Sequence, residues 1–154
     1  MTSLEEILQK DGKLIYRTKG VSMEPMLRQN RDLVEIRVPA LRLKKYDVAL
    51  YKRGSSYVLH RVMKVLPDGY LIRGDNTYHP EKVPEEAVLG VLARFVRKGK
   101  TWEVTNPCYQ LYVRMWQLLY PLRAGIHFLY RLCVRMAKKA GIRRNPFKRK
   151  AAGR

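Results

Sequence analysis

The segment GVSMEPML, residues 20–27, holds a serine where the chain can present a nucleophile. Gly20 permits backbone angles that other residues avoid, and Pro25 fixes φ three residues after Ser22. We therefore expect Ser22 at a rigid turn. A serine hydroxyl is a poor nucleophile until a base accepts its proton, so this chemistry needs a base from another segment. Without one, the segment is an ordinary turn.

His60 is the most suitable base, because it lies in the strand-like segment YVLHRVMKVL. Side chains alternate between the two faces of a strand, so His60 shares a face with Val58 and Val62. An imidazole in this semi-apolar setting, with a pKa near neutrality, is a workable general base. A lone histidine is more often a non-catalytic side chain, and His60 alone does not overturn that interpretation.

RGDN, residues 73–76, supplies a third candidate group. Asp75 follows a predicted strand and is suited either to orient His60 or to brace the loop by accepting hydrogen bonds from backbone amides. Gly-Asp-Asn is also a common turn sequence, and composition alone favours the turn.

The elements that position these groups are short strands separated by Gly, Asp and Pro turns. Strands are predicted for residues 13–19, 32–39, 46–53, 57–66, 70–74, 87–99 and 101–105, after a short helix over residues 3–10. Residues 75–84 are predicted to be a polar loop. This rhythm indicates a mainly β fold, a twisted antiparallel sheet or partly open barrel.

Beyond Pro107 the pattern becomes helical. Apolar residues recur at steps of three and four from Leu111 to Met136, and Pro121 is expected to kink or split the helix. We predict three parts: a β domain over residues 1–106, an amphipathic basic helical appendage over 107–141, and a disordered basic tail over 142–154.

Positive charge is concentrated at one end of the chain. Residues 1–93 hold 16 basic and 12 acidic residues, whereas residues 94–154 hold 16 basic residues and only Glu103. Nucleic acid, anionic lipid and acidic proteins are the common partners of such a section. No cleavable signal peptide and no ordinary transmembrane helix are predicted.

Cys108 and Cys133, the only cysteines, lie in apolar or aromatic sequence and are predicted to be buried reduced thiols. No CxxC pair or Cys/His cluster indicates a metal site, and we expect no metal and no cofactor.

Taken in order, GVSMEPML, DLVEIR, YDVALYK, YVLHRV, RGDN and VLGVL resemble the signal peptidase I / LexA-type serine protease superfamily, over roughly residues 13–95. One branch uses a Ser–Lys dyad. The other, typified by endoplasmic-reticulum and archaeal signal peptidases, has histidine in place of lysine, and LHRV stands where that base belongs. The resemblance implies Ser22 as nucleophile, His60 as general base and Asp75 as assisting acid.

The same resemblance implies a signal peptidase-like β core and an oxyanion hole that uses the Ser22 backbone N–H. It also implies an extended peptide substrate with small residues before the cut. The candidate substrate-binding residues are Met23, Pro25 and Met26. The chain departs from the family where Arg31-Asp32 and Tyr46-Asp47 replace Gly-Asp, where Gly20 replaces a hydroxyl donor, and where no N-terminal membrane anchor is predicted.

The sequence thus predicts a serine endopeptidase that cleaves a precursor, leader or signal peptide, in the cytoplasm or peripherally at the inner face of the membrane. Residues 108–150 either bind an anionic membrane surface or pack as a helix on the core with a solvated tail. Nucleic acid binding rests on charge alone, because no known module is matched. Two alternatives are a self-cleaving LexA-type regulator, with Lys52 or Lys64 as base, and a non-catalytic module for peptides or anionic surfaces.

Overall fold

The structure is a computed structural model that describes residues 4–139, and these divide into two compact units between Arg114 and Met115. The first unit contains helix α1 (Leu4–Asp11), all the described strands and the beginning of helix α2 (Pro107–Leu118). The second contains the end of α2 and helix α3 (Tyr120–Lys139). The predicted tail, residues 142–154, lies outside the described residues.

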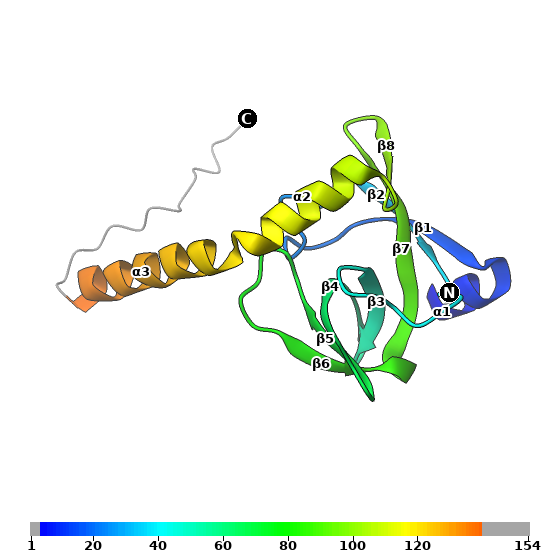
Figure 1. Ribbon diagram of the computed structural model, residues 1–154, viewed down its shortest axis with the longest axis horizontal. Helices are drawn as coiled ribbons and strands as arrows, with labels where there is room; N and C mark the ends of the chain where they lie inside the picture. Colours follow the sequence, from blue (N-terminus) through cyan, green and yellow to red (C-terminus); the bar gives the residue numbers. More distant parts are fainter. Residues whose placement is uncertain (1–3, 140–154) are drawn as a thin grey trace, which may run out of the picture. The chain divides into compact units, whose positions relative to one another are not determined.

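One antiparallel sheet forms the body of the first unit (Figure 1). Its path runs β1-β2-β7-β3-β4-β5-β6, and β8 pairs with β7. Strands β1 and β6 are the two ends of this path. Among the described residues they do not pair with each other, so the sheet is not closed into a barrel. The predicted mainly β antiparallel fold is therefore confirmed, as an open sheet. The strands are β1 (Lys13–Arg17), β2 (Leu33–Arg37), β3 (Val48–Arg53), β4 (Ser56–Leu66), β5 (Gly69–Arg73), β6 (Glu81–Pro84), β7 (Val88–Arg97) and β8 (Lys100–Glu103), with a 3-10 helix (Glu85–Ala87) before β7.

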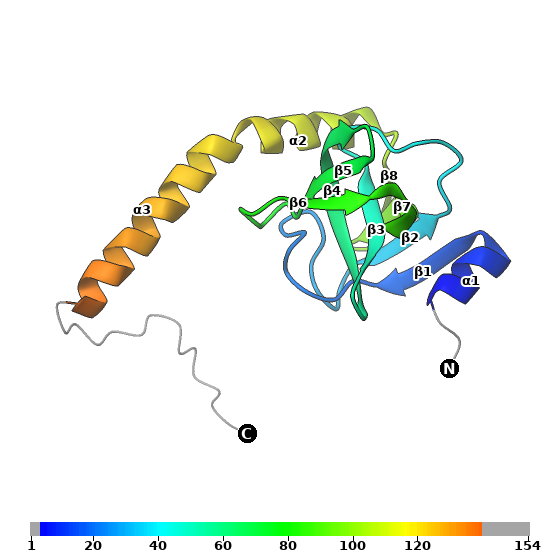
Figure 2. The same cartoon turned by 90° about the horizontal axis from the view of Figure 1, so that it is seen from below.

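Strand β6 corrects the sequence prediction of a loop over residues 75–84. The strand is short and rich in charge, and only Val83 within it is buried. It forms by pairing with β5, where Glu81 lies opposite Ile72, and Figure 2 shows it beside β4 and β5. Short, charged strands that contain proline are typical of sheet edges and carry little local signal.

Strands β3 and β4 separate two hydrophobic clusters. Their register places Ala49 opposite His60. Ala49 and Tyr51 belong to one cluster, whereas Leu50 belongs to the other. Alternation along β4 therefore puts His60 on the Tyr51 face of the sheet and Arg61 on the opposite face.

Helix α2 begins inside the core of the first unit. Tyr109 and Val113 are buried in the main hydrophobic cluster. The Asn106 side chain caps the helix by accepting hydrogen bonds from the backbone N–H groups of Cys108 and Tyr109. Because this packing continues into the helix, the first unit ends at Arg114 and not at the predicted boundary, residue 106.

The helical region is interrupted where the sequence predicts. Helix α2 ends at Leu118 and α3 begins at Tyr120, one residue before Pro121, which has no N–H to donate to the carbonyl four residues back. No described helix has the length and apolarity needed to cross a membrane.

Both cysteines are exposed free thiols, which corrects the prediction that they are buried. The apolar neighbours that suggested burial are themselves exposed around Cys133, as Leu129 and Leu132 show. Cys108 lies in the first turn of α2, where only the face that carries Tyr109 and Val113 is buried.

Candidate active site

The loop that contains Ser22 is tied to the RGDN loop. The Asn76 backbone N–H donates to the Ser22 carbonyl over 2.8 Å, and the Asn76 side-chain amide donates to the Val21 carbonyl over 3.2 Å. Gly20 adopts a φ of +85°, which supplies the turn that the sequence predicts before Ser22. Two segments far apart in the chain are thus held side by side.

Gly74 allows His60 and Ser22 to approach the same point. A Cβ atom at Gly74 would lie 2.7 Å from the Ser22 carbonyl oxygen and 3.1 Å from both Cδ2 and Nε2 of His60. No side chain fits there unless one of these groups moves. The Nε2 edge of the imidazole therefore lies close to the Ser22 main chain.

Ser22 and His60 line a common cleft of about 890 Å³ within the first unit. This volume lies within the range of roughly 300–1,000 Å³ that is usual for ligand sites. Apolar and polar side chains both contribute to the walls. They include Leu4, Tyr16, Met23, Leu27, Tyr57, Val58 and Leu59, together with Arg17, Thr18, Lys19, Arg53, Ser55, Ser56 and Thr77.

The second ring nitrogen of His60 has partners that the sequence analysis missed. Nδ1 lies 3.0 Å from the Tyr51 hydroxyl and 3.4 Å from Oε1 of Glu81. The Tyr51 hydroxyl also donates to Glu81, and Arg53 pairs with the same carboxylate over 3.2 Å. Tyr51 lies two residues beyond Ala49 on β3, and is therefore a diagonal neighbour of His60.

The protonation states of this cluster follow from burial and charge. Burial lowers the pKa of His60 below its ordinary value; Glu81 opposes the change and Arg53 adds to it. Burial alone would raise the pKa of Glu81, but Tyr51 and Arg53 bring it below its ordinary value. Burial and the Glu81 carboxylate raise the pKa of Tyr51. At neutral pH the cluster therefore contains a neutral imidazole, a carboxylate and a protonated phenol.

These states determine which nitrogen of His60 carries the proton. An ionised carboxylate only accepts hydrogen bonds, so the single O–H proton of Tyr51 is directed at Glu81. The Tyr51 oxygen then accepts from Nδ1–H of His60. The lone pair is then on Nε2, within the Cδ2–Nε2 edge of the ring that borders Gly74 beside the Ser22 carbonyl. This is the tautomer that a general base for Ser22 requires.

Asp75 has a different partner from the one predicted. Its carboxylate accepts hydrogen bonds from Arg61, over 2.8 Å from Nε and 2.6 Å from Nη2, and both side chains are fully buried. Arg61 also donates to the Tyr46 carbonyl and the Tyr109 hydroxyl. Burial disfavours the charge of Arg61, but Asp75 more than compensates and raises the pKa of the guanidinium.

The geometry therefore identifies Tyr51 and Glu81 as groups placed to orient His60. They contact Nδ1, whereas the Asp75 carboxylate forms a two-point ion pair with Arg61. Asp75 acts on His60 through its charge, which raises the pKa of the imidazole less than burial lowers it. The assisting role of Asp75 stays a prediction.

Of the three predicted substrate-binding residues, Met23 lines the cleft. Met26 is 1 % exposed, and its sulfur accepts a hydrogen bond from Arg61 over 3.0 Å. Pro25 is not among the described residues that line the cleft. Met26 is buried because the chain turns after Ser22. A hydrogen bond from the Leu27 N–H to the Met23 carbonyl closes this turn and directs Met26 into the core.

The lysines considered as alternative bases lie elsewhere. Lys52 forms an ion pair with Glu5 over 2.7 Å, and Lys64 is exposed on β4. Neither is among the described residues that line the Ser22 cleft. The site therefore favours the Ser–His arrangement over the Ser–Lys arrangement.

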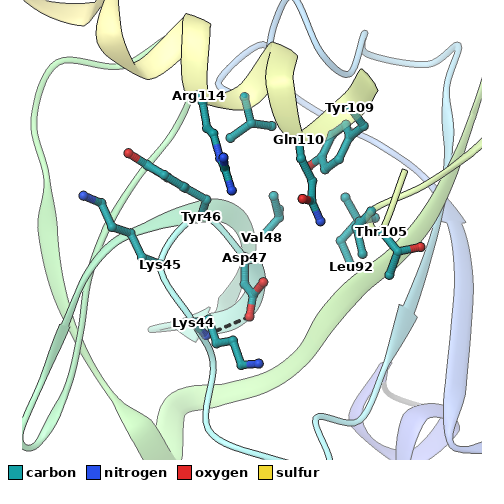
Figure 3. Close-up of a pocket in the computed structure, with 12 residues that line it drawn as sticks. Lys44, Lys45, Tyr46, Asp47, Val48, Leu92, Thr105, Tyr109, Gln110 and Arg114 are labelled. Atoms are coloured by element: carbon teal, nitrogen blue, oxygen red, sulfur yellow. Dashed lines mark hydrogen bonds between the residues drawn. The ribbon is translucent and has the colours of Figure 1, made fainter. Parts of the chain in front are cut away.

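A second pocket, of about 350 Å³, lies beside the Tyr46-Asp47 turn. Figure 3 shows the side chains that line it. Tyr46 has a φ of +79°, a value that glycine adopts more easily, and the Asp47 carboxylate accepts from the Lys44 N–H over 2.8 Å. Asp47 therefore still braces this turn without the preceding glycine. The described lining offers no histidine or serine, so this pocket lacks the groups for the chemistry at Ser22.

Neither a protein-family model nor any curated protein sequence matched the chain. The described residues also contain no cluster of three or more His, Cys, Asp or Glu side chains suited to a metal ion.

Proposed function

We propose that the protein is a serine endopeptidase in which Ser22 is the nucleophile and His60 the general base. The observation that carries this proposal is the position of His60, whose Nε2 lies near the Ser22 main chain while Nδ1 is bound by Tyr51 and Glu81. The motif order that resembles the Ser–His branch of the signal peptidase superfamily supports it, and a signal peptidase-like character of the sheet is part of the proposal.

In the proposed mechanism, the Ser22 hydroxyl oxygen attacks the scissile carbonyl carbon as Nε2 of His60 takes the hydroxyl proton. The Ser22 backbone N–H is the expected donor to the resulting oxyanion. The imidazolium then gives its proton to the leaving amine, and an acyl-enzyme remains on Ser22. Water attacks this ester with His60 again as base, which releases the new carboxyl end and restores Ser22.

In this scheme the Tyr51–Glu81 pair stabilises the protonated form of His60. While His60 carries the extra proton, the Glu81 carboxylate stabilises the positive charge through Tyr51 and by its own proximity. Tyr51 and Glu81 are positioning residues, because they act on the substrate only through His60.

The proposed substrate is an extended peptide segment of a precursor, leader or signal peptide. Strand β1 ends the sheet path and leads into the Ser22 loop, so its outer edge is suited to pair with an added strand. The partly exposed side chains of Tyr16, Tyr57 and Leu59 offer apolar contacts for substrate side chains within the cleft.

The proposal is tested by incubating the protein with a proteome-derived peptide library and identifying new peptide ends by mass spectrometry. We expect wild-type protein to cut a defined set of peptides, and Ser22→Ala to cut none of them. Ser55→Ala is the matched control, because Ser55 lines the same cleft and has no proposed role. Equal cleavage by wild type and Ser22→Ala would reject the proposal.

The α3 helix supports a second proposal, contact with an anionic membrane surface through residues 108–150. Its described part carries Arg123, Arg131 and Arg135, and Phe128 is exposed among other large apolar side chains. Flotation with vesicles of anionic phosphatidylglycerol or neutral phosphatidylcholine tests this directly. Binding to the anionic vesicles alone is expected, and no flotation with either would reject it.

A further inference from the structure

A separate cavity of about 570 Å³ lies between the β7–β8 hairpin and the first turns of α2, entirely within the first unit. It shares none of its lining with the Ser22 cleft. Its walls combine aromatic rings with cationic side chains. The lining residues are Met26, Phe95, Arg97, Lys98, Lys100, Trp102, Cys108, Tyr109 and Tyr112.

The floor of this hairpin pocket is aromatic. Phe95 and Tyr109 are buried, with ring centroids 5.5 Å apart in a tilted arrangement. Trp102 and Tyr112 are partly buried and pack against the same hydrophobic cluster. A concave, mainly apolar site of this size with a few polar groups is the usual form of a small-ligand pocket.

Its rim is cationic. The turn between β7 and β8 contains Lys98 and Gly99 at φ values of 51° and 75°, and this tight reversal brings Arg97, Lys98 and Lys100 to one pocket. No aspartate or glutamate is among the described lining residues. The two lysines are exposed, so their charges are available to a ligand at the mouth.

We propose that the hairpin pocket binds an anionic amphiphile, a molecule with an apolar chain and an acidic head. The chain lies against Phe95, Trp102 and Tyr112, because burying apolar surface there is favourable. The head lies at Lys98 and Lys100, where charge attraction selects the anion. Such a molecule is either a free fatty acid-like anion or an anionic lipid of a bilayer, and the experiment below separates these sources.

Cys108 provides an internal probe, because it lines the pocket and is exposed, while Cys133 is exposed in the second unit and serves as reference. Alkylation of both thiols by iodoacetamide is followed by mass spectrometry, with sodium decanoate below its micelle-forming concentration. We expect decanoate to slow alkylation of Cys108 at least fivefold and to leave Cys133 unchanged.

Matched ligands and variants test each half of the proposal. Decyltrimethylammonium has the same chain with the opposite charge, and acetate has the same head without the chain; neither should protect Cys108. The pair Lys98→Glu and Lys100→Glu should weaken the apparent decanoate affinity roughly tenfold or more. The pair Lys13→Glu and Lys82→Glu lies at exposed strand positions outside the pocket and makes the same change in net charge. It should leave the decanoate affinity unchanged.

The source of the ligand is decided with vesicles. Protection by phosphatidylglycerol vesicles as well as by decanoate assigns a bilayer lipid, and protection by decanoate alone assigns a free anion. Absence of protection by decanoate, equal protection by decyltrimethylammonium, or equal protection by acetate would each overturn the proposal. Ser22→Ala should bind decanoate as wild type does, so the outcome is independent of the proposed peptidase activity.

Discussion

His60 and Arg61 are neighbours on β4, yet their surroundings differ in kind. Arg61 is completely buried and is bonded to Asp75, Tyr46 and Tyr109. His60, on the opposite face, binds Tyr51 and Glu81 through one nitrogen and borders the Ser22 cleft. The Arg61–Asp75 pair is enclosed in the interior, whereas His60 lines an open cleft.

Under the proposed function, one strand supplies both a buried ion pair and the general base. A buried ion pair tolerates no loss of a partner, because the remaining charge stays in an apolar interior. A neutral histidine can lose its function without leaving an unpaired charge. Substitutions on the two sides should therefore separate activity from stability.

The largest expected effect is at His60. His60→Gln retains a polar side chain of similar size but removes the base, so kcat on the best-cleaved library peptide should fall about 10²–10⁴-fold. Urea unfolding should show a smaller loss of stability than substitution of Asp75 causes. Retention of full activity would mean that another group is the base.

The next effect is on the Arg61–Asp75 side. Asp75→Ala leaves the Arg61 charge buried without its carboxylate and should reduce the free energy of unfolding by about 3–5 kcal/mol. The measurement is urea denaturation followed by circular dichroism. The double substitution Arg61→Met and Asp75→Leu is the control, since it removes both charges and should recover much of that loss. A change below about 1 kcal/mol in Asp75→Ala would show that the pair is not essential for folding.

Tyr51→Phe should have a more moderate effect. It removes one of the groups that hold the proton on Nδ1 of His60, so part of the imidazole should change to the Nε2–H tautomer. We expect kcat to fall roughly tenfold, the scale of one hydrogen bond to a charged group in the transition state. Nitrogen-15 NMR of the His60 ring distinguishes the tautomers. An unchanged ring spectrum would remove the positioning role from Tyr51. Tyr57→Phe is the control, because it also removes a tyrosine hydroxyl that donates to a glutamate.

The smallest effect concerns pH. In the proposed mechanism neutral His60 is the active form. The value of kcat/KM should therefore be full above the pKa of His60, which is lowered from the ordinary value, and should be lost as pH falls through it. Glu81 raises and Arg53 lowers this pKa. The acid limb of the profile should therefore move to lower pH in Glu81→Gln and to higher pH in Arg53→Met. Shifts in the same direction would contradict the assigned electrostatics.

The sequence alone predicts the parts of this site that depend on local pattern. The alternation of side chains along β4 places His60 and Arg61 on opposite faces of the sheet, and Gly20 indicates the turn before Ser22. Gly74 shows its importance only in three dimensions, because its close contacts are with Ser22 and His60.

The Tyr51–Glu81 link is outside the reach of local pattern for a physical reason. Glu81 lies on an edge strand that forms through pairing with β5 and has little intrinsic strand signal. The burial of Met26 is likewise not predictable from local pattern, because it depends on a turn of the backbone and on contact with the buried Arg61. The prediction that Cys108 and Cys133 are buried was wrong, because an apolar helical sequence does not specify which face of the helix is covered.

Labelling by a fluorophosphonate is the sharpest test of the proposal that His60 activates Ser22. The label reacts with an activated serine and is located by peptide mass spectrometry, with Ser55 and Ser56 in the same cleft as internal references. We expect label on Ser22 in wild-type protein, at a rate about a hundredfold or more above that in His60→Gln. Label on another serine, or an equal rate on Ser22 in His60→Gln, would contradict it.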